Sequence, residues 1–163
     1  MDETQLTKLH LTVAAVVERQ GQFLVVEELA GGQLVINQPA GHVEPGEALA
    51  DAVIREVKEE TAWTFEPTAI IGAYLWTHPV SGEQFLRAVY HGDVCSHDSD
   101  QPLDEGILRN LWLTPEDLLK RQPQLRSPMV MRAIDDYLAG IRHPVNMYQH
   151  IALEQLAEKA AVV

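Results

Sequence analysis

The sequence has little that would suit secretion or membrane insertion. Among its 163 residues it has one cysteine, Cys95, so no intramolecular disulfide can form and a reducing compartment is expected. No run of 18 apolar residues occurs, and the N-terminus lacks the basic and apolar segments of a secretion signal. We therefore expect a cytoplasmic protein that does not enter a membrane.

Positive charge is also scarce. There are 12 Lys and Arg residues against 24 Asp and Glu residues, which gives a formal net charge of −12. A surface of this sign repels a phosphate backbone, so the composition argues against binding to nucleic acid. It repels small phosphorylated compounds as well, so a cation is expected to bridge the protein and any phosphorylated substrate.

The pattern of apolar residues predicts one domain over residues 1–163, with a core of about 9–145. β-Branched and apolar stretches predict a mixed sheet, in which the first two strands form a hairpin around Gln20-Gly21. The predicted strands cover residues 9–17, 23–26, 34–36, 69–76, 85–90 and 108–113. No heptad pattern or long apolar edge is present, so a monomer is expected.

Helices are predicted between and after these strands. Apolar spacing favours a helix from about Glu47 to Thr61. Thr114-Pro115 and Ser127-Pro128 each place a capping residue before a proline, which is typical of helix starts. Residues 146–163 are predicted to form a helical tail, with one apolar face made by Ile151, Leu156 and Ala160. The fold class is therefore α/β (α+β), with a mixed sheet sandwiched between helices.

The densest charge cluster lies on the first predicted helix. Glu56, Glu59 and Glu60 are three and four residues apart, so their side chains converge on one face. Such a cluster is either a solvated acidic face or a cation site. Glu56 and Glu60 project to the edge of the buried arc, where unpaired carboxylates are unfavourable. This position favours a site for a hard divalent cation such as Mg²⁺.

The spacing around this cluster resembles the Nudix box, G-x5-E-x7-R-E-U-x-E-E-x-G-U, where U is apolar. The fixed positions are Gly41, Glu47, Arg55, Glu56, Glu59, Glu60 and Ala62. All match except the last, where the family has glycine and this chain has Ala62. Because glycine at a helix end usually supplies a left-handed backbone, the departure concerns the helix exit rather than the acidic residues. The resemblance implies the Nudix fold.

The resemblance also implies roles for the box residues. Glu56, Glu59 and Glu60, with the backbone carbonyl of Gly41, are expected to hold the metal. Glu47 and Arg55 are expected to pair and support the loop against the helix. The implied cofactor is Mg²⁺, with Mn²⁺ as the alternative.

Two residues are candidates for the general base that activates water. Glu59 lies among the expected ligands, and Glu105 lies in the polar loop before the last predicted strand. We favour Glu59. Glu105 has two alternative interpretations, as a further metal ligand or as a solvated loop residue.

Substrate contacts are predicted around the box. Asn37, Gln38 and His42 line its approach and either bind phosphate or order the loop. Arg87, between apolar strand residues, is a candidate phosphate clamp, with an ordinary cross-strand or exposed arginine as the alternative. Trp76 is a candidate stacking surface for a ring, with core packing as the alternative.

The stretches Asn37–Glu44 and Leu125–Pro128 resemble the NudJ-like phosphatases within this family. The resemblance implies metal-dependent hydrolysis of phosphoanhydride bonds in small nucleoside di- or triphosphates or in organic pyrophosphates. Hydroxymethylpyrimidine diphosphate and thiamine diphosphate are examples of the latter. The alternatives are a non-catalytic nucleotide sensor on the same scaffold and an RNA 5′-end pyrophosphohydrolase.

Overall fold

The computed structural model describes residues 8–152. One sheet has the strand order β5-β1-β7-β6-β9. In it β1 and β7 run parallel and the other neighbours run antiparallel, so the sheet is mixed. Its strands are β1 (Leu9–Val16), β5 (Ala40–His42), β6 (Trp63–Thr77), β7 (Gln84–His97) and β9 (His143–Pro144).

A second sheet centres on β3, which pairs antiparallel with β2, β4 and β8. The bounds of these strands are β2 (Glu18–Arg19), β3 (Gln22–Ala30), β4 (Gln33–Asn37) and β8 (Ile107–Leu113). The predicted hairpin is wrong in one respect, because β1 pairs with β5 and β7 rather than with β3. The turn at Gln20-Gly21 instead joins β2 to β3.

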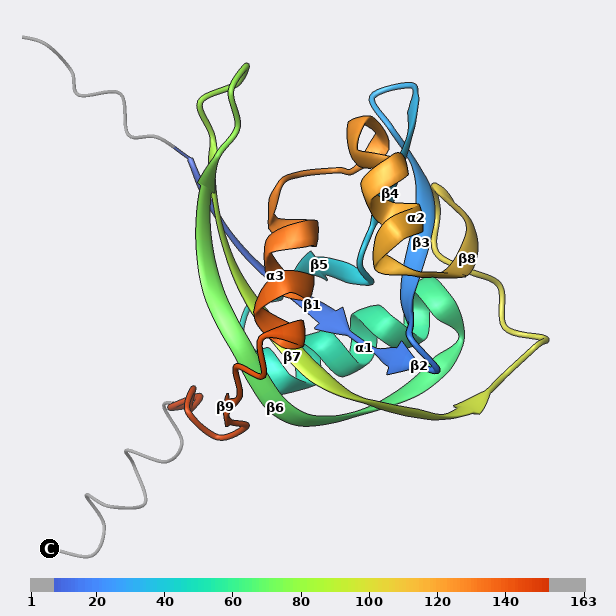
Figure 1. The fold of residues 1–163 in the computed structure, drawn as a ribbon. Coiled ribbons are helices and arrows are strands. Elements are labelled where there is room, and N and C mark those ends of the chain that lie inside the picture. The colour runs from blue at the N-terminus through green and yellow to red at the C-terminus, as the bar shows by residue number, and fades with distance from the viewer. Residues whose placement is uncertain (1–7, 153–163) are drawn as a thin grey trace, which may run out of the picture.

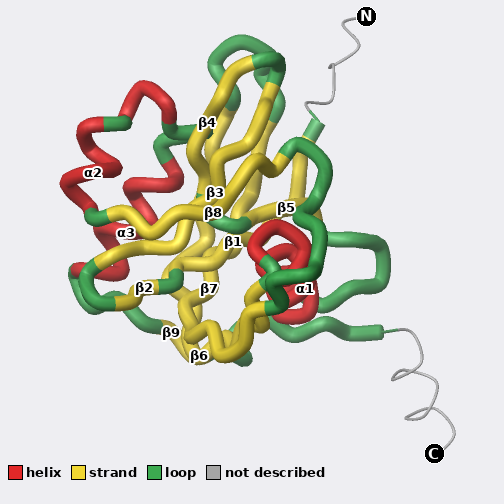
Figure 2. The backbone as a smooth tube through the Cα atoms, turned by 90° about the vertical axis from the view of Figure 1, so that its right-hand side faces the viewer, coloured by secondary structure: helices red, strands yellow, loops and turns green. Residues whose placement is uncertain are grey.

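The helices lie on both sides of the strands. They are α1 (Leu49–Thr61), α2 (Pro115–Lys120), the 3₁₀ turn η1 (Gln122–Gln124) and α3 (Met129–Leu138). Figure 2 shows α1 on one side of the strands and α2 and α3 on the other, and Figure 1 shows α3 across the face of the long strands β6 and β7. The predicted mixed sheet between helices is confirmed. No helix within residues 8–152 is long and apolar enough to cross a membrane.

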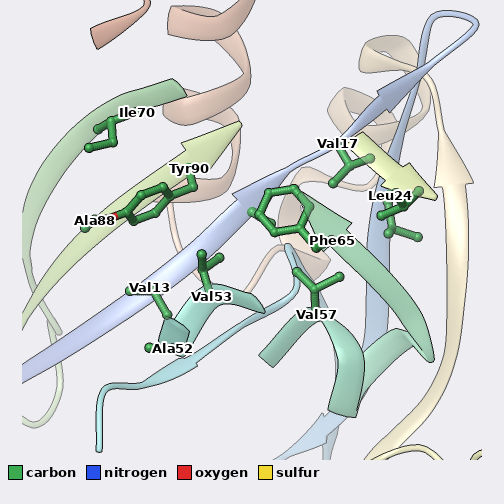
Figure 3. Packing of buried hydrophobic residues seen from close by; sticks show 12 residues of the cluster. Val13, Val17, Leu24, Ala52, Val53, Val57, Phe65, Ile70, Ala88 and Tyr90 are labelled. Atoms are coloured by element: carbon green, nitrogen blue, oxygen red, sulfur yellow. The ribbon is translucent and has the colours of Figure 1, made fainter. Parts of the chain in front are cut away.

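Two apolar clusters join these layers. On one face, Val53 and Val57 of α1 pack with Val13 of β1 and Phe65 of β6, and Figure 3 shows both valines directed toward the sheet. On the other face, α3 packs on the neighbouring residues of β1 and β7, which point the opposite way because side chains alternate along a strand. The first cluster fixes the position of α1 against one face of the sheet, and the second fixes α3 against the other face.

Two helix predictions require correction. Ser127 does not cap α3 with its side chain, because the helix begins after Pro128 without any side-chain cap. The predicted tail contains no helix over residues 146–152, and Ile151 lies in irregular chain. The other two residues of the predicted tail face, Leu156 and Ala160, lie outside the described residues.

Candidate active site

Helix α1 carries the three box glutamates at the edge of the core. Glu56 and Glu60 are buried, at 7% and 6% exposure, whereas the Glu59 side chain is 43% exposed. The apolar residues at helical spacing bury one face of α1 against the sheet. Glu56 and Glu60 lie at the edge of that face, so they are partly enclosed with it. The cluster is therefore not a freely solvated acidic face.

The Arg55 guanidinium joins the box loop to the helix. It donates from Nε and Nη2 to the two oxygens of Glu47, at 2.8 and 2.9 Å. Its Nη1 also donates to Glu56 Oε1 at 2.7 Å and to Glu59 Oε2 at 3.0 Å. A further bond from Nη2 to the carbonyl oxygen of His42 is 3.0 Å long. The predicted Glu47–Arg55 partners are thus in a bidentate pair, and Arg55 also contacts two box glutamates, which the sequence reasoning missed.

These contacts have opposite effects on the carboxyl groups. Hydrogen bonding to Arg55 lowers the pKa of Glu47. Burial raises the pKa of Glu56 despite its bond to Arg55. Burial also raises the pKa of Glu60 to about 9, although Glu60 Oε2 accepts a hydrogen bond from the Ala40 N–H at 2.9 Å. Glu60 therefore needs additional positive charge to be a carboxylate at neutral pH, and such a charge would favour the carboxylate form of Glu56 as well.

The backbone of Gly41 lies in close contact with the carboxylate of Glu56. A Cβ atom at position 41 would lie closer than 3.0 Å to the carboxylate atoms of Glu56, a distance that real Cβ atoms avoid. Strand β5 thus places the Gly41 backbone directly against the acidic helix, and only glycine fits there.

The residues present fit a divalent cation. Within residues 8–152 no three His, Cys, Asp or Glu side chains already form a metal cluster. Arg55 bonds to one oxygen each of Glu56 and Glu59, which leaves the other carboxylate oxygen of each available to a cation. The donors are all oxygens, two of the carboxylates are buried with raised pKa values, and the glycine backbone is adjacent. A hard cation suits such a donor set.

Helix α1 ends at the position where the chain departs from the box. Ala62 adopts the left-handed conformation, with φ 60° and ψ 7°, and its N–H donates to the carbonyl oxygen of Lys58 at 2.9 Å. Alanine therefore makes the same helix exit that glycine would make.

A pocket of about 570 Å³ with both polar and apolar lining includes Gly41. Four of the predicted substrate contacts line it, namely Asn37, His42, Trp76 and Arg87. The segment that precedes α3 also lines it. The pocket and the acidic helix are thus adjacent, with the Gly41 backbone between them.

Arg87 supplies positive charge to this pocket. Its residue exposure is 6%, and its Nη1 donates to Asn37 Oδ1 at 3.2 Å. Its Nε has no hydrogen-bond partner in the described part of the chain. Burial lowers the pKa of Arg87 to about 10, so the guanidinium remains charged at neutral pH. It is not the exposed arginine of the alternative interpretation.

Gln38 lies away from the pocket, so its prediction as a substrate contact requires correction. The residue is 1% exposed, and its Nε2 donates to the carbonyl oxygen of Val130 in α3, at 3.2 Å. Because Asn37 and Gln38 are consecutive, their side chains point to different sides of the chain. Only Asn37 points into the pocket.

The structure separates the two candidates for the general base. Glu105 is exposed in its loop, whereas Glu59 lies on α1 with the other box glutamates. The loop attaches to the helix through its preceding residue, because the Asp104 N–H donates to the carbonyl oxygen of Glu59 at 3.0 Å. The charge of Asp104 also contributes to the raised pKa of Glu56 and Glu60. Sequence reasoning missed Asp104, although it is next to Glu105 in the same acidic loop.

The mixed sheet between helices and the acidic helix that follows the Gly41 loop are features of one class of hydrolases. The NUDIX domain model matches residues 8–133, so the chain belongs to the Nudix family, as the box predicts. It is a hydrolase, and Nudix hydrolases generally use divalent metals.

Known proteins agree with this assignment. Phosphatase NudJ of Shigella boydii is 40% identical over 140 residues, which cover 86% of this chain and 90% of that protein. Phosphatase NudJ of Escherichia coli K12 is 39% identical over 140 residues. A solved structure, a Nudix hydrolase from Nitrosomonas europaea, has a TM-score of 0.86 and 43% identity, and the match covers 88% of this chain and 98% of that one. The chain is thus similar to NudJ phosphatases over most of its length.

Proposed function

We propose that the protein hydrolyses phosphoanhydride bonds in small nucleoside di- or triphosphates or in related organic pyrophosphates. The observation that carries this proposal is the buried pair Glu56 and Glu60 against Gly41, beside a pocket that contains the buried guanidinium of Arg87. Similarity to phosphatase NudJ supports it. Hydroxymethylpyrimidine diphosphate and thiamine diphosphate are included among the substrates.

The cofactor in this proposal is Mg²⁺, with Mn²⁺ as the alternative. Glu56, Glu59, Glu60 and the Gly41 carbonyl would hold it. When bound, such an ion polarises a phosphoryl oxygen and lowers the pKa of a coordinated water. The buried carboxylates and the glycine contact are the observations in favour of these ligands.

The protein's own residues position the substrate. Arg87 binds a phosphate through donors that the pocket leaves free, and Asn37 fixes the orientation of the guanidinium. His42, whose Nε2 is 2.9 Å from His10 Nδ1, contacts the substrate at the end of the pocket nearest α1. Trp76 offers a flat face to the organic group. Glu47 and Arg55 hold the loop that carries Gly41.

Glu59 is the proposed general base. It is the most exposed of the box glutamates, so it can reach a water molecule, and Arg55 fixes its orientation. A base positioned in this way contributes roughly 10²–10⁴-fold to the rate. Glu105 is the alternative base, although its loop leaves it exposed.

The rival functions have less support. A non-catalytic sensor has no need of the box glutamates, and all of them are present. RNA 5′-end processing requires a positively charged channel, which a net charge of −12 does not favour. A cytoplasmic location and a monomeric state stay predictions.

Phosphate and pyrophosphate release from a panel of nucleotides and organic diphosphates tests the proposal. We expect hydrolysis that depends on Mg²⁺ or Mn²⁺ and that falls strongly in Glu59→Gln and Glu60→Gln. A 5′-triphosphate RNA in the same panel tests the RNA alternative. Wild-type rates in both variants, or no release from any substrate, would contradict the proposal.

A further inference from the structure

The last turn of α1 carries two of the three box glutamates at an unfavourable end of the helix. A helix leaves its last four carbonyl groups without intrahelical partners, and these groups give its C-terminus a partial negative charge. Glu59 and Glu60 lie directly before Thr61, the last residue of α1. Their side chains therefore add negative charge where the helix already has it, and this charge favours fraying of the turn.

The segment between β7 and β8 donates hydrogen bonds to these carbonyl groups. The Asp98 N–H donates to the carbonyl oxygen of Ala62 at 3.0 Å, and the Asp104 N–H donates to that of Glu59 at 3.0 Å. Figure 1 shows this segment, drawn in yellow, on the side of the molecule where α1 ends. The end of the helix is thus held by a part of the chain that is distant in sequence.

Two side chains complete this set of donors. Gln101 Nε2 donates to the carbonyl oxygen of Lys58 at 2.6 Å. Asn110 Nδ2, from β8, donates to the carbonyl oxygen of Thr61 at 3.3 Å. The Lys58 carbonyl belongs to the planar peptide group that also contains the nitrogen of Glu59. Gln101 therefore holds the peptide group from which Glu59 begins.

Gln101 is itself held in place by a turn. Its N–H donates to the carbonyl oxygen of Asp98 at 3.3 Å, and the Asp100 N–H donates to Asp98 Oδ1 at 3.1 Å. The residue is partly buried rather than exposed. Its side-chain amide is thus directed at the helix by a segment that is bonded both within itself and to α1.

We propose that Gln101 is a positioning residue for the metal site. By holding the peptide group between Lys58 and Glu59, it keeps the last turn of α1, and with it the side chains of Glu59 and Glu60, where a divalent cation binds. This role rests on the proposed function, which assigns these glutamates as metal ligands. A purely structural role for Gln101 would stabilise the fold and leave the cation affinity unchanged.

Calorimetric titration with Mg²⁺, in the absence of substrate, separates the two roles. Gln101→Met keeps the length of the side chain and removes its donor. We expect its Kd for Mg²⁺ to rise about 3- to 10-fold, below the 10–100-fold typical of residues that contact metal ligands directly. Asn110→Ala should raise the Kd less, because its bond is longer and Thr61 is not a proposed ligand.

The matched control is Gln124→Met. Gln124 is exposed in η1, which connects α2 to α3 on the side of the strands opposite α1. The same substitution there should keep the wild-type Kd. The Tm of each variant in EDTA reports the change in stability separately from the change in Mg²⁺ affinity.

Hydrogen exchange provides a second readout that needs no variant. If docking of the segment increases the cation affinity, cation binding must increase docking by the same factor. Exchange of the Asp98 and Asp104 N–H groups should therefore slow by about 3- to 10-fold at saturating Mg²⁺, in line with the expected change in Kd. The Gly82 N–H, which bonds to the carbonyl oxygen of His78 in a hairpin turn, should keep its rate.

Three results would overturn the positioning role. The first is a wild-type Kd in Gln101→Met, and a lower Tm in that case would assign Gln101 to structural capping alone. The second is an equal rise of Kd in Gln124→Met. The third is an exchange rate of the Asp98 and Asp104 N–H groups that Mg²⁺ does not change, which decides the matter even if Gln101→Met does not fold. Absence of Mg²⁺ and Mn²⁺ binding by the wild type would instead contradict the proposed ligands, and the positioning role with them.

Discussion

The carboxylate of Glu56 lies against the backbone of Gly41 so closely that position 41 has no room for a side chain. The contact joins strand β5 to helix α1 at the acidic cluster. It also explains the first fixed position of the box in steric terms, because a methyl group there would push Glu56 away from the other box residues.

Gly41→Ala should therefore reduce hydrolysis strongly. A displacement of about 1 Å in an active site lowers activity by roughly 10²-fold, and we expect a loss of this size. The measurement is kcat/KM at saturating Mg²⁺. Gly82→Ala is the control, because Gly82 has φ +72° but nothing within 4 Å of an added Cβ. Equal losses in the two variants would show that general strain, rather than the Glu56 contact, is responsible.

Arg55→Lys should weaken the acidic cluster without removing its charge. Lysine cannot reproduce the bidentate contact with Glu47 together with the bonds to Glu56 and Glu59. Residues that orient metal ligands typically contribute about 10–100-fold to metal affinity or activity, so we expect a loss in that range. A Mg²⁺ titration of activity measures it.

The control for this variant is Arg132→Lys. Arg132 has an exposed side chain, pairs with Asp136 of the same helix α3, and forms no ion pair with the box residues. We expect wild-type activity and Mg²⁺ dependence. If Arg55→Lys also behaves as wild type, the arginine is dispensable for arranging the cluster.

The sequence predicts the acidic helix well because the relevant information is local. Glu56, Glu59 and Glu60 need only helical spacing and an apolar face to converge, and both are readable within one helix. The family box adds Gly41 and Glu47 through fixed spacing. The helix exit at Ala62 follows the box although the residue differs, because an αL residue ends α1 in either case.

Long-range packing decides what the sequence cannot predict. Gln38 and Asn37 are neighbours, yet Gln38 contacts Val130, 92 residues later in the chain. Ser127 has a capping sequence, but α3 begins after Pro128 without a side-chain cap. Asp104 and Glu105 are adjacent carboxylate residues, and only the docking of their loop on α1 distinguishes them. Each case depends on which side of a segment faces a distant element.

Glu105→Gln should leave hydrolysis within about twofold of the wild type, as for other exposed substitutions. Glu59→Gln should lower kcat by roughly 10²–10⁴-fold if it removes the general base. Asp104→Asn should weaken Mg²⁺ binding severalfold, because it removes a negative charge that acts on Glu56 and Glu60. Pre-steady-state rates with a Mg²⁺ titration separate these effects. A large kcat loss in Glu105→Gln would reverse the assignment of the base.

The stability of the metal-free protein should depend on pH through Glu60. Its pKa rises from an ordinary value of 4.5 to about 9 on folding, because of burial. Between these values the folded state binds more protons than the unfolded state, so the free energy of unfolding falls as pH rises from about 5 to 9. Mg²⁺ should reduce this dependence, since a bound cation favours the carboxylate.

Thermal unfolding in EDTA and in Mg²⁺ across this pH range measures the effect. Glu60→Gln cannot titrate, so its Tm in EDTA should vary less with pH than that of the wild type. An unchanged slope in this variant would assign the pH dependence to other groups.

Ala62 provides the last prediction, which concerns stability alone. It is 2% exposed and has φ 60°, a conformation that costs a residue with a Cβ about 1–2 kcal/mol. Ala62→Gly removes this strain. The substitution also destabilises the folded state in two ways. The greater freedom of the unfolded glycine chain costs about 0.5–1 kcal/mol, and the loss of a buried methyl group costs about 0.8 kcal/mol. These terms nearly cancel, so we expect a change in unfolding free energy within about 1 kcal/mol and unchanged hydrolysis.

Ala62→Val separates this account from one in which any small residue is tolerated. Valine keeps the left-handed strain, adds β-branching and overpacks a buried site, which together should destabilise the protein by more than about 2 kcal/mol. Urea unfolding of the three proteins gives the comparison. A valine variant as stable as the wild type would mean that residue 62 leaves the left-handed region. The valine variant would then have a different helix exit, and with it a different position of the neighbouring Glu59 and Glu60.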